Sequence, residues 1–345
     1  MKTNKILVVQ SGRFDFDGKK VYSITSKRQI AVLEEKGLDL TVFLIQNRKS
    51  FVGFFRSISA LRKHLNQNSY SIIHAHFGSI VSFISMLCIP KKIPFVVSVC
   101  GSDLLGNYDS GFKSKIRSVL SRWMTLLSLY RATYVVCKSL NLKSKIPINF
   151  HHKIHVIPNG IDTEYFRPIS NKKILKKSLG WNAGEFQILF NGGTMKSLNE
   201  INVKNYPLAL KAFEIFNQNC PQSNMNVAMN LKSNEFLQWI QASDCVLLTS
   251  FHEGSPNLVK EALSCNIPVV SVPCGDVFER LKEVNIGGCS TYSPDDLAHE
   301  LLKVYKALVK FNGREVIFNQ RLDQNKMVSM WINVYDNCLN KKIRS

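Results

Sequence analysis

The sequence predicts an α/β fold of two domains, each built on a parallel β-sheet covered by helices. Short apolar runs bounded by polar residues, such as residues 6–10 and 95–99, alternate with segments of helical periodicity, which is typical of parallel sheets. The turn-forming run Pro158-Asn159-Gly160 divides the chain near its middle. The chain has 345 residues, enough for two domains of ordinary size.

The first half contains five predicted strands, at residues 6–10, 40–46, 71–77, 95–99 and 134–139. A helix is predicted over residues 26–36, with Gly37 as its stop. Because parallel strands present their carboxyl ends at one edge of the sheet, the loops that follow them are candidate binding loops. Gly12, His76, Cys100 and Asp103 lie in or directly before these loops.

The second half begins with a predicted strand over residues 187–191 that enters a Gly192-Gly193 loop. Lys204 precedes a predicted helix at residues 208–216. The remaining predicted elements are strands at 245–250 and 267–272, and helices at 257–263, 294–308 and 318–339. The lysine and the glycine loop together suggest one wall of a phosphate-binding pocket.

The stretch from residue 250 to residue 261 carries the most specific signal. An apolar strand is followed by a turn at Gly254 and Ser255, and Pro256 suits the start of a helix that continues through Asn257 and Leu258. A helix N-terminus after such a turn presents backbone N–H groups that can bind a phosphate. Glu253 and Glu261 bracket the turn, and a sugar or ribose hydroxyl suits a carboxylate beside a phosphate.

This Glu-x7-Glu pattern resembles the donor-site signature of retaining GT-B glycosyltransferases, the GT4-like family, of the bacterial capsule, O-antigen and teichuronic-acid type. Ile73-His74-Ala75-His76 and Gly101-Ser102-Asp103 are also similar to stretches of this family. The resemblance implies two Rossmann-like domains with parallel sheets facing across an interdomain cleft. The expected boundaries are 1–165, 166–317 and 318–345, the last a helix that returns to the first domain.

The same resemblance implies the residue roles. Glu253 contacts the donor sugar, Lys204 neutralises the leaving diphosphate, and Glu261 binds ribose hydroxyls. Gly192, Gly193, Gly254, Ser255, Pro256, Asn257 and Leu258 complete the donor site, whereas Gly12, His76, Cys100 and Asp103 belong to the acceptor side of the cleft. The family commonly has a histidine where Cys100 stands and an arginine before the lysine; here Lys196 is the nearest basic substitute for that arginine.

The net charge of +20 indicates an acidic partner or surface. Residues 1–168 hold 25 Lys and Arg against 9 Asp and Glu, whereas the remaining residues hold 20 against 16. Two basic amphipathic helices are predicted at residues 51–65 and 112–131, and they suit either an anionic membrane surface or packing on the sheet. No motif for nucleic acid is present, so we expect no nucleic-acid partner.

The nine cysteines are scattered without a Cys-x-x-Cys pair, which favours neither a disulfide framework nor a zinc site. No Asp-x-Asp pair is evident, so no essential metal and no cofactor beyond the donor substrate are expected. No apolar run reaches the length of a spanning helix. These features predict a cytoplasmic protein, peripheral on the inner face of the cytoplasmic membrane.

The sequence therefore predicts a retaining hexosyltransferase-type enzyme. It transfers a sugar from a nucleotide sugar to a lipid-linked or oligosaccharide acceptor, with a polyprenyl-diphosphate-linked glycan the expected one, in bacterial envelope polysaccharide biosynthesis. Two alternatives stay open: a degenerate nucleotide-sugar-binding or scaffold protein without turnover, and a nucleotide-sugar 2-epimerase. Turnover of the donor separates enzyme from scaffold, and dependence on an acceptor separates transferase from epimerase.

Overall fold

The computed structural model describes residues 4–15, 17–46, 50–106, 112–193 and 203–343. The chain forms two compact units: residues 1–160 with 325–345 make unit 1, and residues 161–324 make unit 2. The chain leaves unit 1 directly after the predicted turn at Pro158-Asn159-Gly160 and returns to it with its last helix. Lys196 lies outside the described residues.

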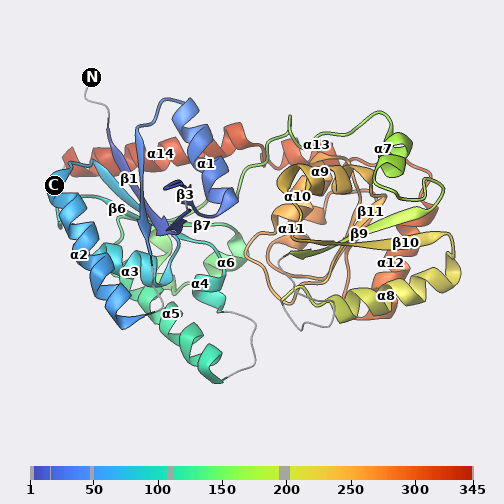
Figure 1. Cartoon of the computed structure of the whole chain (residues 1–345), viewed down its shortest axis with the longest axis horizontal. Helices are drawn as coiled ribbons and strands as arrows, with labels where there is room; N and C mark the ends of the chain where they lie inside the picture. Colours follow the sequence, from blue (N-terminus) through green and yellow to red (C-terminus); the bar gives the residue numbers. More distant parts are fainter. Residues whose placement is uncertain (1–3, 16, 47–49, 107–111, 194–202, 344–345) are drawn as a thin grey trace. The chain divides into compact units, whose positions relative to one another are not determined.

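Unit 1 is built on a six-stranded sheet with the order β4-β1-β5-β6-β7-β8, in which every pair is parallel (Figure 1). Its strands are β1 (Ile6–Ser11), β4 (Leu40–Ile45), β5 (Ile72–His76), β6 (Phe95–Val99), β7 (Tyr134–Cys137) and β8 (Ile154–Val156). The connections from β1 and β4 run in opposite senses across the sheet, so β1 and β5 flank a topological switch point. Ligands bind at the carboxyl ends of such strands.

Side chains from alternate positions of the strands pack on opposite faces of the unit 1 sheet. Ile73 and Val97 belong to the core under α2, α3 and α5, whereas Ile72 and Val96 belong to the core under α1 and α14. The helices of unit 1 are α1 (Ile24–Glu35), α2 (Phe51–Gln67), α3 (Ser79–Cys88), α4 (Ser102–Leu105), α5 (Phe112–Arg131), α6 (Leu140–Ser144), the 3₁₀ helix η1 (Ile148–Lys153) and α14 (Gln324–Ile343).

A small antiparallel hairpin, β2 (Arg13–Phe14) with β3 (Lys20–Val21), follows β1. The Asp15 carboxylate accepts hydrogen bonds from the backbone N–H groups of Asp17 and Lys19, which closes the turn. A Cβ at Gly12 would lie 2.7 Å from the Val21 carbonyl oxygen and 2.9 Å from a Leu44 methyl group. Gly12 is therefore required for the close approach of the hairpin to β4.

Unit 2 contains a five-stranded parallel sheet with the order β10-β9-β11-β12-β13. Its strands are β9 (Phe186–Gly193), β10 (Ser223–Met229), β11 (Cys245–Leu248), β12 (Val269–Ser271) and β13 (Gly288–Cys289). Figure 1 shows α8 and α12 on one face of this sheet and α9 and α10 on the other. The helices are α7 (Lys172–Ser178), α8 (Tyr206–Asn219), α9 (Ser233–Ala242), α10 (Asn257–Ser264), α11 (Val277–Leu281), α12 (Pro294–Lys306) and α13 (Gly313–Asn319). The switch point lies between β9 and β11.

The C-terminal segment differs from the single helix predicted from residue 318 onward. Phe318 belongs to α13, and α14 begins only at Gln324. Between them Arg321 has a φ of 54°, and Gln324 donates its backbone N–H to Ile161 at 3.0 Å. The left-handed residue and this backbone pairing interrupt the helix. In the part of the chain that the structure describes, no helix is long and apolar enough to cross a membrane.

Candidate functional site

The loop after β11 is tied to the segment that precedes α8. The buried Thr249 hydroxyl lies 3.0 Å from the carbonyl oxygens of both Lys204 and Asn205, and Phe251 donates its N–H to Val203 at 2.9 Å. Asn205 has a φ of 55°, a left-handed conformation that asparagine tolerates, directly before α8. These bonds hold the loops from β9 and β11 together at the switch point.

Lys204 and Glu253 form an ion pair at this place. The Lys204 Nζ lies 2.7 Å from Glu253 Oε1, and 24% and 23% of the two side chains remain exposed. The Ser250 hydroxyl donates to the same carboxylate oxygen at 3.2 Å. The structure thus brings together two of the predicted site residues that are 49 positions apart. The pair is partly solvated, so either group can exchange its partner for a ligand.

The predicted glycine loop lies against the same lysine. Gly193 ends β9 with a φ of 62°, and a Cβ there would lie 3.8 Å from the Lys204 Cε. Gly192 is buried within β9 and contributes no side chain to a ligand surface. The glycine at position 193 therefore leaves room for a ligand beside the Lys204 side chain.

The turn before α10 is held by a buried polar network. The Ser255 hydroxyl donates to Asp276 Oδ2 at 2.9 Å and accepts from Lys260 Nζ at 3.2 Å. Arg280 Nε donates to the same Asp276 oxygen at 2.9 Å. Lys260 and Asp276 are 0% and 1% exposed. Because the Ser255 hydroxyl is occupied in this way, its contribution to an anion site is its backbone N–H.

The helix α10 begins after Pro256, and among the described residues no side-chain hydrogen bond to its N-cap position is found. Its first turn therefore offers backbone N–H groups and a positive dipole end to an anion. Leu258 is 6% exposed and belongs to the core of unit 2, which restricts its role to its backbone. Glu261 lies in the second turn of α10 and is 8% exposed.

Gly275 allows the loop after β12 to pack closely against the Glu253 loop. Its φ is 61°, and a Cβ would lie 2.9 Å from the Glu253 carbonyl oxygen and 3.2 Å from that of Gly254. The loop after β12 thus packs directly on the loop after β11. The sequence did not single out Gly275, Asp276 or Lys260, because their contacts with the Glu253 loop and the start of α10 depend on the fold.

Unit 1 places Asp103 in a structural role, which corrects the expectation that its side chain faces a ligand. The side chain is fully buried, and its carboxylate accepts backbone N–H bonds from Gly78, Cys100 and Gly101 at 2.8 to 3.1 Å. Burial raises the pKa of Asp103, and these N–H bonds oppose that rise. Asp103 therefore joins the loops after β5 and β6.

Three neighbouring strands of the sheet carry polar residues at their carboxyl ends: His76 is the last residue of β5, and Cys100 and Lys138 directly follow β6 and β7. Burial, helped by the positive Lys138, lowers the pKa of His76 to about 3, and burial raises the pKa of the Cys100 thiol to about 12. His76 is therefore a neutral imidazole and Cys100 a neutral thiol at ordinary pH. Neither group is poised to act as a charged nucleophile.

Lys138 was not predicted from the sequence. It is 2% exposed, its ammonium lies 5.5 Å from the centre of the Trp331 ring, and its Nζ has no hydrogen-bond partner among the described residues. Burial lowers the pKa of Lys138. His74 lies nearby in the core. Its Nδ1 is 3.0 Å from the Tyr335 hydroxyl and its Nε2 is 2.7 Å from the Ser98 hydroxyl, so it helps to hold α14 against the sheet.

Among the described residues, no group of three or more His, Cys, Asp or Glu side chains could hold a metal ion. The charged side chains of the unit 2 site include Lys204, Glu253 and Glu261, with Lys260, Asp276 and Arg280 beside them. This set, together with the α10 N-terminus, suits an anionic ligand that also offers hydroxyl groups.

Two protein-family descriptions match the chain in succession. Residues 15–165 match Glycosyltransferase Family 4, and residues 214–307 match Glycosyl transferases group 1. Together with the two parallel sheets, these matches define a GT-B glycosyltransferase fold. The chain belongs to the GT4-like glycosyltransferase family.

Curated relatives agree with this assignment. The chain is 26% identical over 250 residues to the UDP-Gal:α-D-GlcNAc-diphosphoundecaprenol α-1,3-galactosyltransferase of Escherichia coli, a match that covers 64% of this chain and 62% of the relative. It is 25% identical over 240 residues to the putative teichuronic acid biosynthesis glycosyltransferase TuaC of Bacillus subtilis, covering 64% and 58%. The matched region thus spans about three fifths of each relative.

Solved structures share the fold over nearly the whole chain. Sucrose-phosphate synthase from Thermosynechococcus elongatus superposes with a TM-score of 0.74 at 11% identity, covering 98% of this chain and 100% of that one. HepE from Anabaena, solved in complex with UDP, gives a TM-score of 0.67 at 15% identity, covering 96% and 100%. At such identities the likeness shows the fold alone.

Proposed function

We propose that the protein is a retaining glycosyltransferase that transfers a sugar from a nucleoside-diphosphate sugar to a polyprenyl-diphosphate-linked glycan in bacterial envelope polysaccharide synthesis. The observation that carries the proposal is the Lys204–Glu253 contact of 2.7 Å at the switch point of unit 2. In this proposal the lysine ammonium binds the diphosphate and the neighbouring carboxylate contacts the sugar. The names of the relatives, which refer to a UDP-sugar donor, a diphosphoundecaprenol acceptor and bound UDP, support this choice.

In this reaction the bond between the anomeric carbon and the β-phosphate oxygen breaks, and a bond to an acceptor hydroxyl oxygen forms on the same face. The hydroxyl proton passes to the departing phosphate oxygen. Lys204 turns from Glu253 to the diphosphate, where it stabilises the charge that develops on the leaving group together with the amides that open α10. Glu253 then faces the sugar, and Glu261 binds the ribose hydroxyls.

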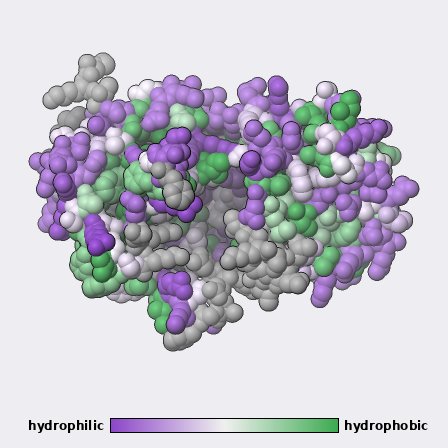
Figure 2. Space-filling model, in the orientation of Figure 1, coloured by the Kyte–Doolittle hydropathy of each residue, from purple (hydrophilic) through white to green (hydrophobic). Residues whose placement is uncertain are grey.

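We further propose that the enzyme works at the cytoplasmic face of a membrane. Exposed apolar side chains occur on two helices that also carry basic residues: Phe51, Val52 and Phe55 on α2, and Ile116, Val119, Leu120 and Trp123 on α5. In Figure 2 hydrophobic and hydrophilic residues lie side by side where Figure 1 places these helices. A basic and apolar helix face suits an anionic lipid surface.

Donor turnover tests the proposal. Nucleotide sugars are screened by thermal shift, and the stabilising one is assayed for nucleoside-diphosphate release with a lipid-linked glycan acceptor. We expect Lys204→Ala to lower kcat/KM by about 10² to 10³, the range for losing one donor to developing charge. Lys211→Ala, which removes an exposed lysine from α8, is the matched control. Absence of stabilisation by any nucleotide sugar favours a scaffold, and turnover without an acceptor favours an epimerase.

A further inference from the structure

Four polar side chains of unit 1 each have a buried atom that lacks a hydrogen-bond partner among the described residues. These atoms are Gln10 Nε2, His76 Nδ1, Lys138 Nζ and Trp331 Nε1. Gln10, Lys138 and Trp331 are 3%, 2% and 0% exposed. Because the great majority of buried polar groups in folded proteins are hydrogen-bonded, four such atoms in one unit require an explanation.

The strand register places three of these side chains on one face of the sheet. In a parallel sheet, paired residues share a face, and so do residues two positions apart along a strand. His76 pairs with Ser98, and Ser98 pairs with Val136, so Lys138, two positions after Val136, lies on the same face. The register of β1 against β5 places Gln10 on this face as well, next to His76.

The helix α14 covers this face with Trp331, which belongs to the same core as Val136. The Lys138 ammonium lies 5.5 Å from the centre of the Trp331 ring. The His74 ring lies 4.8 Å from the Trp331 ring and 5.5 Å from the His76 ring. These contacts bring His76, Lys138 and Trp331 together between the sheet and α14.

The four atoms without partners share one chemical property, because each can donate a hydrogen bond. The Lys138 ammonium, the Trp331 indole N–H and the Gln10 amide nitrogen are donors only, and His76 Nδ1 carries a proton in one neutral tautomer. The carbonyl oxygen of Gln10 already accepts a hydrogen bond from the Ser26 hydroxyl of α1 at 2.7 Å. Since donors do not bond to one another, their common partner has to be an acceptor.

The charge of Lys138 favours an acceptor that is an anion. Burial lowers the pKa of Lys138 and the Asp103 carboxylate opposes this, but that carboxylate is bonded to backbone N–H groups of the loops after β5 and β6. The Trp331 ring attracts the ammonium, but a cation–π contact is weaker than the hydration that a buried ion loses. A bound anion compensates the remaining charge.

We propose that His76, Lys138 and Trp331, with Gln10 beside them, form a binding site for a small inorganic anion between the sheet and α14. Because Lys138 and Trp331 are buried, the site suits a monovalent ion of the size of chloride rather than a phosphate ester. The anion joins β5 and β7 to α14 and so stabilises the packing of the last helix on unit 1. This site does not depend on the proposed function.

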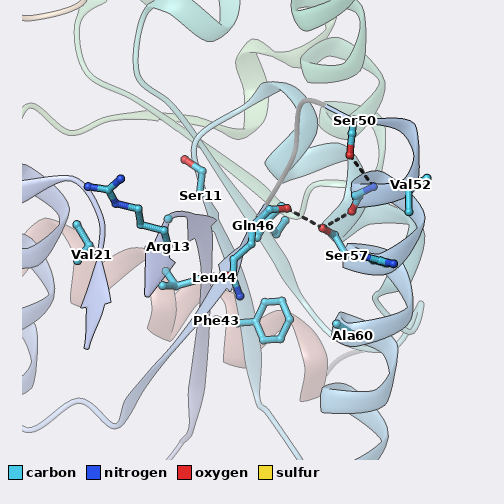
Figure 3. Close-up of a pocket in the computed structure, with 14 residues that line it drawn as sticks. Ser11, Arg13, Val21, Phe43, Leu44, Gln46, Ser50, Val52, Ser57 and Ala60 are labelled. Atoms are coloured by element: carbon cyan, nitrogen blue, oxygen red, sulfur yellow. Dashed lines mark hydrogen bonds between the residues drawn. The ribbon is translucent and has the colours of Figure 1, made fainter. Parts of the chain in front are cut away.

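The proposed anion site is separate from the open cavity of unit 1 that Figure 3 shows. That cavity has a volume of about 920 Å³ and lies between the β2–β3 hairpin, β4 and the first turns of α2. Figure 3 shows Gln46 and Ser57, which are joined by a hydrogen bond, among its lining residues. None of the four residues with unpaired donors lines it. A ligand of the cavity therefore leaves these donors unpaired.

Crystals of the full chain grown in sodium bromide test the site directly, because bromide is located by its anomalous scattering. We expect an anomalous peak within hydrogen-bond distance of Lys138 Nζ and Trp331 Nε1. Lys138→Met removes the charge at nearly constant volume and should abolish the peak. Trp331→Phe keeps an aromatic ring, removes the indole N–H and should weaken the peak.

Thermal denaturation in sodium chloride and in sodium gluconate, at equal ionic strength, tests the site in solution. We expect the Tm of the wild type to rise with chloride concentration relative to that of Lys138→Met, because an ion that binds only the folded state stabilises it. Trp331→Phe should bind chloride about tenfold more weakly, since one hydrogen bond to an ion is lost.

Lys153→Met is the matched control for the loss of a lysine from unit 1. The Lys153 Nζ donates to the carbonyl oxygens of Leu129 and Ala132 at 2.6 and 3.0 Å, so this lysine has protein partners. We expect the Tm of Lys153→Met to fall while its dependence on chloride stays that of the wild type.

The other results contradict the proposal. If Lys138→Met and Lys153→Met depend on chloride as the wild type does, the ion acts elsewhere and the proposal is wrong. If wild-type crystals contain water and no bromide at this place, the donors are bonded to buried water, and the proposal is wrong. If Lys138→Met does not fold, the bromide peak of the wild type and its weakening in Trp331→Phe decide the question.

Discussion

At the scale of single residues, Gly275 shows how the Glu253 loop depends on a residue outside the Glu-x7-Glu motif. Its left-handed φ of 61° is shared by Gly180, whose φ is 73°, but only Gly275 packs on the Glu253 loop. A Cβ at Gly180 meets nothing within 4 Å. Comparing alanine substitutions at the two glycines therefore separates the effect of backbone strain from the effect of a clash with the Glu253 loop.

We expect Gly275→Ala to lower the unfolding free energy by more than the roughly 1 kcal/mol expected from strain alone, and to raise the donor KM. Gly180→Ala should lower the unfolding free energy by the strain contribution alone and leave the donor KM unchanged. Thermal denaturation and donor kinetics on the two variants measure both effects. Equal stability losses with an unchanged donor KM in Gly275→Ala would show that the Glu253 loop tolerates displacement.

His76 makes unit 1 sensitive to acid. In the folded protein burial lowers the pKa of His76 to about 3, whereas the unfolded chain has an ordinary histidine pKa of about 6.5. Below pH 6.5 the unfolded state therefore binds more protons, and stability falls as the pH drops toward 3. We expect His76→Gln to flatten this dependence by up to about 1.4 kcal/mol per pH unit.

Denaturant titrations between pH 7 and pH 4 measure that slope, with the exposed His152→Gln as the control. An unchanged slope in His76→Gln would show that other groups account for the acid sensitivity. His74, whose pKa is also lowered by burial, remains in both variants and adds the same slope to each.

The strand, turn and helix around the Glu-x7-Glu motif were largely predictable, because the motif is local in sequence, whereas its role as a donor site stays a prediction. Its partner Lys204 could be inferred from its place after the glycine loop, although the 2.7 Å ion pair is a product of folding. Lys138 had no such signal. It reads as an ordinary lysine after a strand, and its burial depends on Trp331, almost two hundred positions away in the chain.

At the scale of elements, apolar runs predicted strands such as Phe95–Val99 well. The β2–β3 hairpin and β10 are among the elements that were missed. The β2–β3 hairpin has only two residues in each strand, and β10 contains Asn224 and Asn226, so neither gives an apolar run. Both gain their stability from neighbours: the hairpin from its approach to β4 at Gly12, and β10 from its pairing with β9. Sequence periodicity does not report such contacts.

Unit 1 includes the helix α14, which is far in the sequence from the other elements of the unit. Trp331 is fully buried, and it packs with Ile72, Val96 and Val136 of the sheet. We expect Trp331→Ala to destabilise unit 1 by about 3–5 kcal/mol, the usual range for a buried aromatic side chain. Ser329→Ala on the exposed side of α14 should change stability by less than about 0.5 kcal/mol.

Hydrogen exchange resolves this effect by unit. Trp331→Ala should increase exchange in β5, β6 and β7 while leaving β9 and β11 protected, because those strands belong to the core of unit 2. Equal protection of unit 1 in wild type and Trp331→Ala would mean that α14 is not needed to hold the sheet together.

At the scale of the whole molecule, the charge is divided as the proposed reaction requires. Residues 1–168 hold 25 Lys and Arg against 9 Asp and Glu. The rest of the chain is closer to neutral and holds the paired Lys204 and Glu253. The proposed lipid surface therefore concerns the basic part of the chain, and the proposed nucleotide sugar concerns unit 2.

This division of charge predicts which helix binds an anionic membrane. Lys113, Lys115 and Arg117 are exposed on α5 near the apolar Ile116 and Val119. Since each basic residue near an anionic surface contributes about 1 kcal/mol, we expect the triple glutamine variant to bind phosphatidylglycerol vesicles on the order of 100-fold more weakly.

The matched control replaces three exposed lysines of unit 2, Lys173, Lys177 and Lys310, with glutamine and so removes the same net charge. Vesicle co-sedimentation over a range of salt concentrations measures both variants. Binding through α5 should fall with rising salt in the wild type and in the control, since salt screens the attraction between exposed charges. If the two variants lose affinity equally, the net charge attracts the protein to the lipid, and α5 has no special part in membrane binding.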